Sequence, residues 1–189
     1  MDYSISDYKK QIIQHYASVW GDGFSMQTWA KGPASDLGED FCILEFAPTK
    51  SRKMWTYATC CMSNRKNETQ IEMHLFSSTK DESLVELLTA IAHYHNFGKQ
   101  LGLWHTVNFG RPWKNGSNCC YGLISLPYLD GPDLETLNSK EFKPVKFYWL
   151  IPVTENEVDF KKRYGIERLE ESFEGNNFNY LDPLRKSVV

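Results

Sequence analysis

The chain has 189 residues, of which 41% are apolar and 14% aromatic, and this is enough to bury a substantial core in a domain of ordinary size. Its formal net charge is -3, and its basic residues are scattered apart from short clusters at 50–53 and 161–163. Short clusters of this kind are typical of solvated faces, so the charge pattern argues against a nucleic-acid-binding protein. We predict a single domain over residues 1–189.

The first residues lack the basic and then apolar segments of a signal peptide, and no apolar run approaches the length of a membrane span. The five cysteines are Cys42 and two adjacent pairs, Cys60–Cys61 and Cys119–Cys120. Adjacent cysteines on a strand point to opposite faces, which makes them poor ligands for one metal ion. We therefore expect free core thiols in a cytoplasmic protein without metal, cofactor or membrane contact.

The first predicted helix begins after an N-cap at Ser6 and ends near Trp20, before Gly21. Its apolar residues recur at helical spacing, at Ile5, Tyr8, Ile12, Tyr16 and Val19. Residues 21–40 are rich in Gly, Ser, Asp and Pro, which predicts a loop. Three strands are predicted next, at 41–46, 55–63 and 71–76. In the third, Glu72 and His74 lie on one face and the apolar residues on the other.

The central predicted helix has a capping box of Thr79 and Glu82 and an apolar stripe that reaches Tyr94 or His95, with Gly98 to end it. Strands are predicted at 104–109, 121–127 and 145–151, with turn-rich loops at 110–118 and 128–144 between them.

Two short helices complete the pattern. Thr154 and Glu157 form a second capping box for a helix that ends at Gly165, and another helix runs from Ile166 to Gly175 before an irregular tail. Strands and helices mix without strict alternation, which predicts an α+β fold in one domain. We expect a mixed, mostly antiparallel sheet with helices packed against it.

Histidine is the first candidate for chemistry. His93 and His95 lie near the end of the central helix, where residues two apart do not share a face and make a poor metal pair. A ligand role would be open only if this segment were extended. His74 and His105 have apolar neighbours in predicted strands, where a hydrogen-bonded, half-buried ring is commoner than a catalytic base.

A cysteine nucleophile needs a base and an electropositive setting. Cys119 and Cys120 follow the turn-forming residues 115–118, the best place in this chain for a reactive thiol. Five cysteines and five histidines also make chance pairs easy to find. A small cysteine-dependent hydrolase is therefore one alternative function.

Residues 110–117 lack the spacing of a phosphate-binding loop, and Pro112 removes an amide donor. Two interpretations of this segment stay open. Trp113 packs over the core in a tight turn, or Arg111 and Trp113 form a contact patch, since arginine and aromatic residues are enriched in interface hot spots.

The loop after the next predicted strand is acidic, with Asp130, Asp133 and Glu135 around a Gly-Pro turn. Their spacing does not fit a known calcium loop. A solvated turn is the first expectation, an acidic contact surface for a basic partner the second, and a metal site the last.

Several segments, taken in order and spacing, resemble the suppressor-of-fused domain. They are Trp-Thr-Tyr-Ala-Thr at 55–59 with Met62–Ser63, Glu-Met-His-Leu at 72–75, Ala-His-Tyr-His at 92–95, residues 104–113, Leu-Pro-Tyr at 126–128 and residues 148–157. The resemblance implies an α+β domain that acts by binding proteins.

In animals the family includes a cytoplasmic repressor in Hedgehog signalling that captures a transcription-factor peptide as an added strand. This chain covers only the N-terminal lobe of that two-lobed protein. It is more similar to the single-domain bacterial members, commonly assigned as immunity proteins that neutralise polymorphic toxins.

The resemblance matches Tyr94 to the groove tyrosine of the animal protein and His105 to the histidine that starts its following strand. Trp104 stands where the animal protein has an acidic residue that helps to hold its peptide, so a different specificity is implied. We expect a non-enzymatic protein that blocks a toxin by steric capture. The expected partner-binding residues are Tyr94, Trp104, His105, Arg111 and Trp113. A regulatory adaptor that binds a partner peptide by strand addition is the other alternative.

Overall fold

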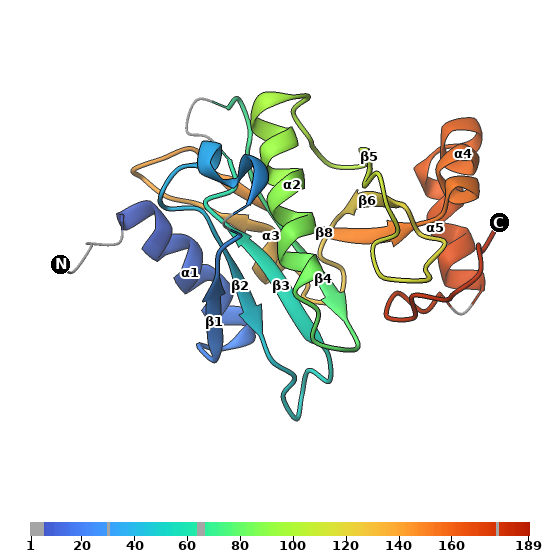
Figure 1. Cartoon of the computed structure of the whole chain (residues 1–189), viewed down its shortest axis with the longest axis horizontal. Coiled ribbons are helices and arrows are strands. Elements are labelled where there is room, and N and C mark those ends of the chain that lie inside the picture. Colours follow the sequence, from blue (N-terminus) through green and yellow to red (C-terminus); the bar gives the residue numbers. More distant parts are fainter. Residues whose placement is uncertain (1–5, 30, 64–66, 177) are drawn as a thin grey trace.

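The computed structural model describes residues 6–29, 31–63, 67–176 and 178–189. Within these residues the sheet has eight strands in the order β1-β2-β3-β4-β8-β6-β5, with β7 pairing β8 beside this path (Figure 1). β4 and β8 run parallel, and the other described pairings are antiparallel. Because helices pack on this sheet, the predicted α+β fold with a mixed, mostly antiparallel sheet is confirmed.

The middle of the sheet consists of strands that are buried over most of their length. They are β2 (Cys42–Phe46), β3 (Trp55–Cys60), β4 (Gln70–Ser77), β6 (Tyr121–Ser125) and β8 (Val145–Val153). Each was predicted, with differences only at the ends. β3 ends before the predicted Ser63 because Cys61 has a left-handed backbone, with φ 63, and the Met62 amide turns to Glu72 Oε1 at 3.0 Å.

Two segments that were predicted as loops contain short elements. β1 (Phe24–Gln27) and the 3-10 helix η1 (Gly32–Leu37) lie in the first, and α3 (Pro132–Glu135) and β7 (Thr136–Leu137) lie in the second. β1 pairs with β2 at the sheet edge, and its four residues alternate apolar and polar side chains over too short a stretch to predict a strand. The other three are too short to show a period.

The first predicted helix is confirmed as α1 (Asp7–Trp20). The Ser6 hydroxyl caps it by accepting the Lys9 amide at 3.3 Å, and Gly21 ends it with φ 86. Ile5 of the predicted stripe and the N-terminal segment expected to lack a leader lie outside the described residues.

The central helix is α2 (Ser83–Phe97), and its predicted capping box is wrong. The Glu82 side chain makes no capping hydrogen bond, and the Thr79 hydroxyl accepts instead from a lysine of a later loop. The cap is supplied by the Asp81 carboxylate, which accepts from the Ser83 amide at 3.0 Å and from its hydroxyl at 2.7 Å. A carboxylate serves this position well because it also faces the positive end of the helix dipole.

The last two helices, α4 (Glu155–Tyr164) and α5 (Ile166–Gly175), match the prediction. The capping box is present, with the Glu157 amide donating to Thr154 Oγ1 at 3.3 Å and the Thr154 amide donating to Glu157 Oε2 at 2.8 Å. Arg185 from the tail donates to the same buried carboxylate at 2.6 and 2.7 Å. This pair fastens the irregular tail to the start of α4.

Alternate residues of the central strands face two different cores. On one face, Ile71, Met73 and Leu75 pack under α2 in an apolar cluster. On the other face, Glu72 and His74 lie on the α1 side, where the His74 ring meets the edge of Trp20 at 5.1 Å. The predicted alternation along β4 is therefore confirmed.

The α1 side of the sheet buries ionisable groups. The Glu72 carboxylate accepts from the Thr59 hydroxyl at 2.5 Å, and burial raises its pKa to about 8. His74 is 0% exposed, and burial holds its pKa well below the ordinary value. Its ring nitrogens make no hydrogen bond in the described part of the chain, and Nε2 lies 3.8 Å from Asp130. The expectation of a half-buried, hydrogen-bonded His74 is therefore wrong.

The expectation of solvated charges also fails at Asp130 and Arg52. These two form an ion pair with side chains 4% and 15% exposed, and Asp130 accepts from Trp20 Nε1 at 2.8 Å. The guanidinium lies over the Trp20 and Phe76 rings, at 4.9 and 5.1 Å from their centroids. The pair links the β2–β3 connection to the acidic turn, a contact between distant segments that local sequence does not reveal.

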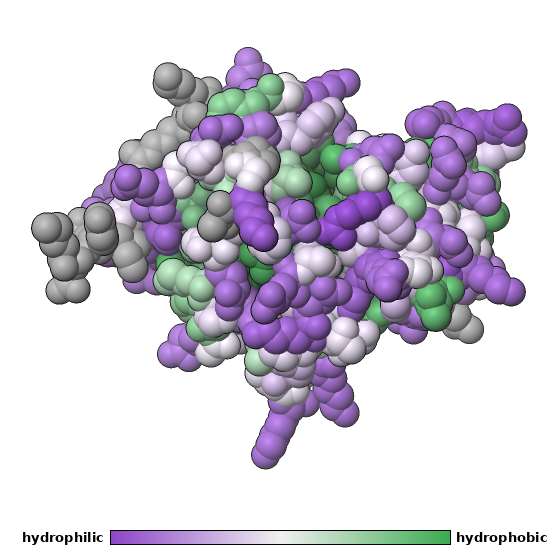
Figure 2. All heavy atoms as spheres, in the orientation of Figure 1, coloured by the Kyte–Doolittle hydropathy of each residue, from purple (hydrophilic) through white to green (hydrophobic). Residues whose placement is uncertain are grey.

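The outer surface is polar over most of the face shown in Figure 2, and apolar side chains gather between α2 and the β5–β6 end of the sheet. Among the described residues, no helix has the length and apolar character to cross a bilayer.

Candidate protein-binding surface

The sheet ends at β5 (Thr106–Asn108), which pairs with β6 on one side. The His105 carbonyl accepts from the Ile124 amide, and the Phe109 amide donates to the Cys120 carbonyl. Inward-facing backbone groups alternate along an antiparallel strand, so those of Thr106 and Asn108 point away from β6. No described strand occupies that outer side, and an open edge is a template for an added strand.

Trp104 forms a bulge at the start of this edge. Its amide donates to the Ile124 carbonyl at 2.8 Å, and the Ile124 amide donates to the His105 carbonyl at 2.9 Å, so two residues oppose one. The His105 amide closes a tight turn onto the Gly102 carbonyl at 3.1 Å. The bulge and turn place Trp104 at φ 65, in the left-handed region that normally takes glycine.

A bulky residue in this conformation costs on the order of 1–2 kcal/mol. The Trp104 side chain is only partly buried, whereas the adjacent Leu103 packs against the α2 core. Strain retained without full burial is typical of residues kept for contact with a ligand or partner. Trp104 thus combines a strained backbone with a partly exposed side chain at the start of the open edge.

Tyr94 lies on the last turn of α2 and is 43% exposed. The helix ends where the Gly98 amide donates to the Tyr94 carbonyl at 2.8 Å. A Cβ at Gly98 would stand 2.9 Å from the Tyr94 ring, so only glycine lets this ring lie over the helix end. Phe97, which the sequence did not single out, is 57% exposed beside it and stacks on His93 at 4.6 Å.

Arg111 does not lie beside Tyr94 but at the other end of α2. Its Nη2 donates to the Ser83 carbonyl at 2.8 Å and lies 3.5 Å from Glu86, at the first turn of α2. Ser83 and Tyr94 are separated by about 16 Å along the helix axis, from a rise of about 1.5 Å per residue. Arg111 thus anchors its loop at the opposite end of α2 from Tyr94.

Trp113 is buried, with 1% of its surface exposed, inside the core cluster under α2. Its amide donates to the Cys119 carbonyl at 3.0 Å, and Lys114 Nζ ties the loop to Ser77 at 2.9 Å. The structure agrees with the first interpretation of this loop, in which Trp113 packs over the core. The expectation that the Trp113 side chain contacts a partner directly is therefore wrong. The candidate surface is accordingly reduced to Tyr94, Trp104 and His105, the last of which is exposed.

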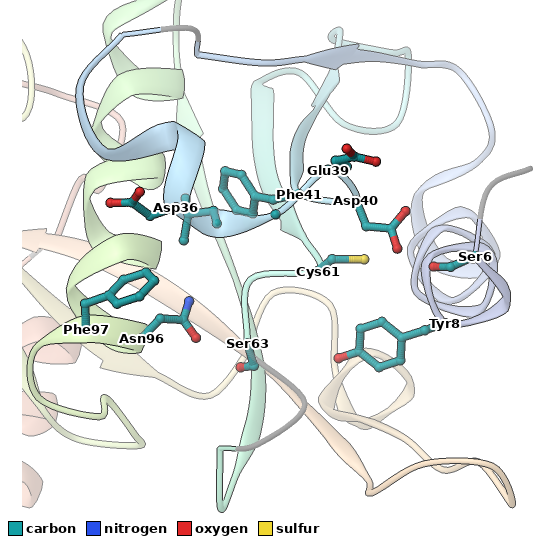
Figure 3. Close-up of a pocket in the computed structure, with 12 residues that line it drawn as sticks. Ser6, Tyr8, Asp36, Glu39, Asp40, Phe41, Cys61, Ser63, Asn96 and Phe97 are labelled. Carbon is teal, nitrogen blue, oxygen red and sulfur yellow. The ribbon is translucent and has the colours of Figure 1, made fainter. Parts of the chain in front are cut away.

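A cavity of about 550 Å³ lies beside the end of α2, between α1, η1 and the start of β2 (Figure 3). Carboxylates of Asp36, Glu39 and Asp40 line it, and the Cys61 side chain points toward it. Phe97, which lies at the same end of α2 as Tyr94, also lines this cavity. These acidic residues belong to the segment predicted as a loop, and no motif in it indicates a pocket.

Among the described residues, Cys119 and Cys120 do not form the cysteine–histidine pair that the hydrolase alternative needs. Cys119 is 1% exposed, and burial raises the pKa of its thiol. In the described part of the chain, neither Cys119 nor Cys120 hydrogen bonds to a histidine. No group of three or more ionisable side chains in this part is arranged to hold a metal ion.

Ser63 and His95 lie close together, and their hydrogen bonds to the neighbouring backbone are structural. Ser63 Oγ lies 3.3 Å from His95 Nε2, but it also donates to the Ile71 carbonyl at 2.9 Å and accepts its amide at 2.7 Å. His95 Nδ1 accepts from the Leu101 amide at 3.0 Å, and burial lowers the histidine's pKa to about 4. Both side chains are fully engaged in linking β3, β4 and α2.

The sequence model of the family described as "Suppressor of fused protein (SUFU)" matches residues 39–186. The chain belongs to the suppressor of fused family. A solved homologue of this family from Neisseria gonorrhoeae is 29% identical, with a TM-score of 0.81 and 97% of each chain covered. A search of curated proteins found no match.

Two further solved structures share the fold at 15% identity. One is a Sufu–Fu complex, with a TM-score of 0.70 and coverage of 96% of this chain and 92% of the other. The other is Drosophila Suppressor of Fused, with a TM-score of 0.68, where 96% of this chain matches 51% of that protein. The chain thus spans about half the length of the fly protein.

Proposed function

We propose that the chain is a non-enzymatic protein-binding domain, and that it acts as an immunity-type protein which captures and blocks a cognate toxin of a bacterial polymorphic toxin system. The family assignment and the bacterial homologue support the binding role. A family structure described as a Sufu–Fu complex supports a protein as the partner. Blocking requires no chemistry from this chain, in keeping with its engaged serine–histidine pair and buried Cys119.

The observation that carries the proposal is the conformation of Trp104. Its φ of 65 places a large aromatic side chain at the rim of the open β5 edge, where it adds little to the core. Tryptophan and tyrosine are the residues most enriched in interface hot spots, because they bury a large area for few rotatable bonds. Trp104 and Tyr94 are the anchors in this proposal, and His105 supplies a polar contact between them and β5.

Growth rescue tests the proposal. The chain is co-expressed with the product of the neighbouring gene under an inducible promoter, and we expect it to restore growth that this product prevents. Trp104→Ala and Tyr94→Ala lower rescue and weaken the purified complex by at least tenfold. Tyr164→Ala is the matched control, since Tyr164 is a 54% exposed aromatic residue on α4. Equal rescue by all three variants would reject the surface, and a harmless neighbouring product would reject the toxin.

A regulatory adaptor that binds a peptide by strand addition is the second candidate, and the open β5 edge favours it. Proline at position 106 removes an outward-pointing amide without breaking the bonds to β6. If the partner adds a strand, Thr106→Pro abolishes binding. Capture by the aromatic side chains alone leaves binding by this variant within a few fold of the parent.

A further inference from the structure

A second cavity lies on the far side of the sheet from α2, between β6, β8 and α5. Its volume is about 420 Å³. Leu123, Trp149 and Ile151 form its floor, and they are 1%, 5% and 4% exposed as members of a packed core cluster. The floor is therefore part of the packed core on this face of the sheet.

Aromatic rings surround the opening. Phe173 of α5 stacks on Phe178 with centroids 4.2 Å apart, and both line the cavity together with Tyr128, above the Trp149 ring of the floor. A cation is attracted to the face of an aromatic ring, most strongly to tryptophan. Phe178 already binds one in this way, because the Arg185 guanidinium lies 4.6 Å from its centroid.

Carboxylates stand at the same opening. Glu170 and Glu174 line it from successive turns of α5, and Tyr128 donates to Glu170 Oε1 at 3.0 Å. Burial, Glu170, Glu135 and Glu174 together raise the pKa of Tyr128 to about 12. In the described part of the chain, neither Glu174 nor Glu135 forms an ion pair. The opening therefore carries uncompensated negative charge.

The floor offers a further polar group. Ser125 lines the cavity and is 1% exposed as a residue, and its hydroxyl makes no hydrogen bond to the rest of the described chain. The hydroxyl can therefore accept a hydrogen bond from a donor that enters the cavity. An apolar floor, aromatic walls, carboxylates at the rim and a free acceptor below match a long side chain with a cationic, hydrogen-bonding end.

We propose that this cavity, the α5 recess, receives an arginine side chain from a protein partner. A guanidinium stacks on aromatic rings and donates in a planar fork to carboxylates. Trp149 provides the ring, and Glu170 and Glu174 provide the carboxylates. The inference rests on the proposed protein-binding function and assigns a second contact to it. The α5 recess lies on the opposite face of the sheet from the α2 core, so a partner that uses both contacts must extend around the sheet.

The test is a titration of the uniformly ¹⁵N-labelled protein with the blocked peptide acetyl-Gly-Arg-Gly-amide, followed by NMR. We expect saturable shifts at the Trp149 indole and the Leu123 and Ile151 amides. The citrulline peptide, which keeps the shape but lacks the charge, binds at least tenfold more weakly. The Glu170→Gln/Glu174→Gln variant loses affinity to the same extent. Glu171→Gln is the matched control, since Glu171 pairs with Arg168 on the exposed side of α5.

Equal binding of both peptides, or equal binding by the doubly substituted variant, would overturn the proposal. Binding of the free amine agmatine without binding of the blocked peptide would also overturn it, since the recess would then serve a small molecule. The titration contains no partner protein, so its result is independent of growth rescue. Loss of rescue with Trp104→Ala and failure of the peptide titration would leave the proposed function standing and reject the α5 recess alone.

Discussion

The middle of the sheet and its β5 edge use aromatic and charged residues in opposite ways. In the middle, the Arg52–Asp130 ion pair is buried between its partners, and the buried Glu72 carboxyl accepts a hydrogen bond from Thr59. At the edge, Trp104 is held in a strained conformation and Tyr94 remains 43% exposed. Polar groups that are buried with partners belong to the fold here, and strain at a partly exposed residue is the better sign of a binding role.

Breaking the buried ion pair has the largest expected effect. Asp130→Ala leaves the Arg52 guanidinium and the Trp20 indole N–H without their acceptor, and we expect the free energy of unfolding to fall by about 3–5 kcal/mol. Urea denaturation measures this. Asp7→Ala is the control, because the Asp7–Lys10 pair is exposed and contributes less than about 0.5 kcal/mol. A similar loss for both variants would mean that Asp130 is no more important than a surface charge.

Substitutions of Trp113 test whether this residue serves the core or the contact surface. Trp113→Ala empties a buried site and lowers the free energy of unfolding by about 3–5 kcal/mol. Trp113→Phe costs less, because it keeps most of the volume and removes an indole N–H that has no partner in the described residues. Binding by the folded Phe variant should match the parent. A selective loss of binding in Trp113→Phe with full stability would restore Trp113 to the contact surface.

Glu72 makes the free energy of unfolding depend on pH. Its pKa is raised by burial from an ordinary 4.5 to about 8, so the folded state holds a proton that the unfolded state releases. The stability from this group is present below pH 4.5 and is lost as the pH rises through 8, with a slope that approaches about 1.4 kcal/mol per pH unit.

Glu72→Gln cannot ionise and removes this slope. The variant should therefore gain stability over the parent steadily between pH 5 and pH 8, as measured by urea denaturation at each pH. Taking the difference between the two proteins cancels the opposite effect of His74 and His95, whose pKa values are lowered by burial. A constant difference across this range would show that Glu72 is ionised in the folded protein.

The same division explains what the sequence could predict. The central strands and α1, α4 and α5 follow from apolar periodicity, N-caps and glycines, which act over a few residues. The burial of Trp113 was one of two interpretations that the sequence left open, and the partners of Asp130 could not be predicted, because both depend on which distant segments meet. The position of Trp104 was suggested by resemblance, but its left-handed backbone depends on the turn from Gly102 and the bulge against Ile124.

The smallest expected effect isolates the strain at the edge. Trp104→Ala and Trp104→Gly both remove the indole, but only glycine adopts φ 65 without penalty. We therefore expect Trp104→Gly to be more stable than Trp104→Ala by about 1 kcal/mol, the reverse of the usual order in a strand. The pair His105→Gly and His105→Ala is the control and should follow the usual order, since His105 is not among the residues with positive φ. Both Trp104 variants should lose partner binding equally, because strain relief restores the backbone and not the contact. If alanine proved the more stable residue at both positions, the bulge would hold no strain and Trp104 would lose its physical claim to a binding role.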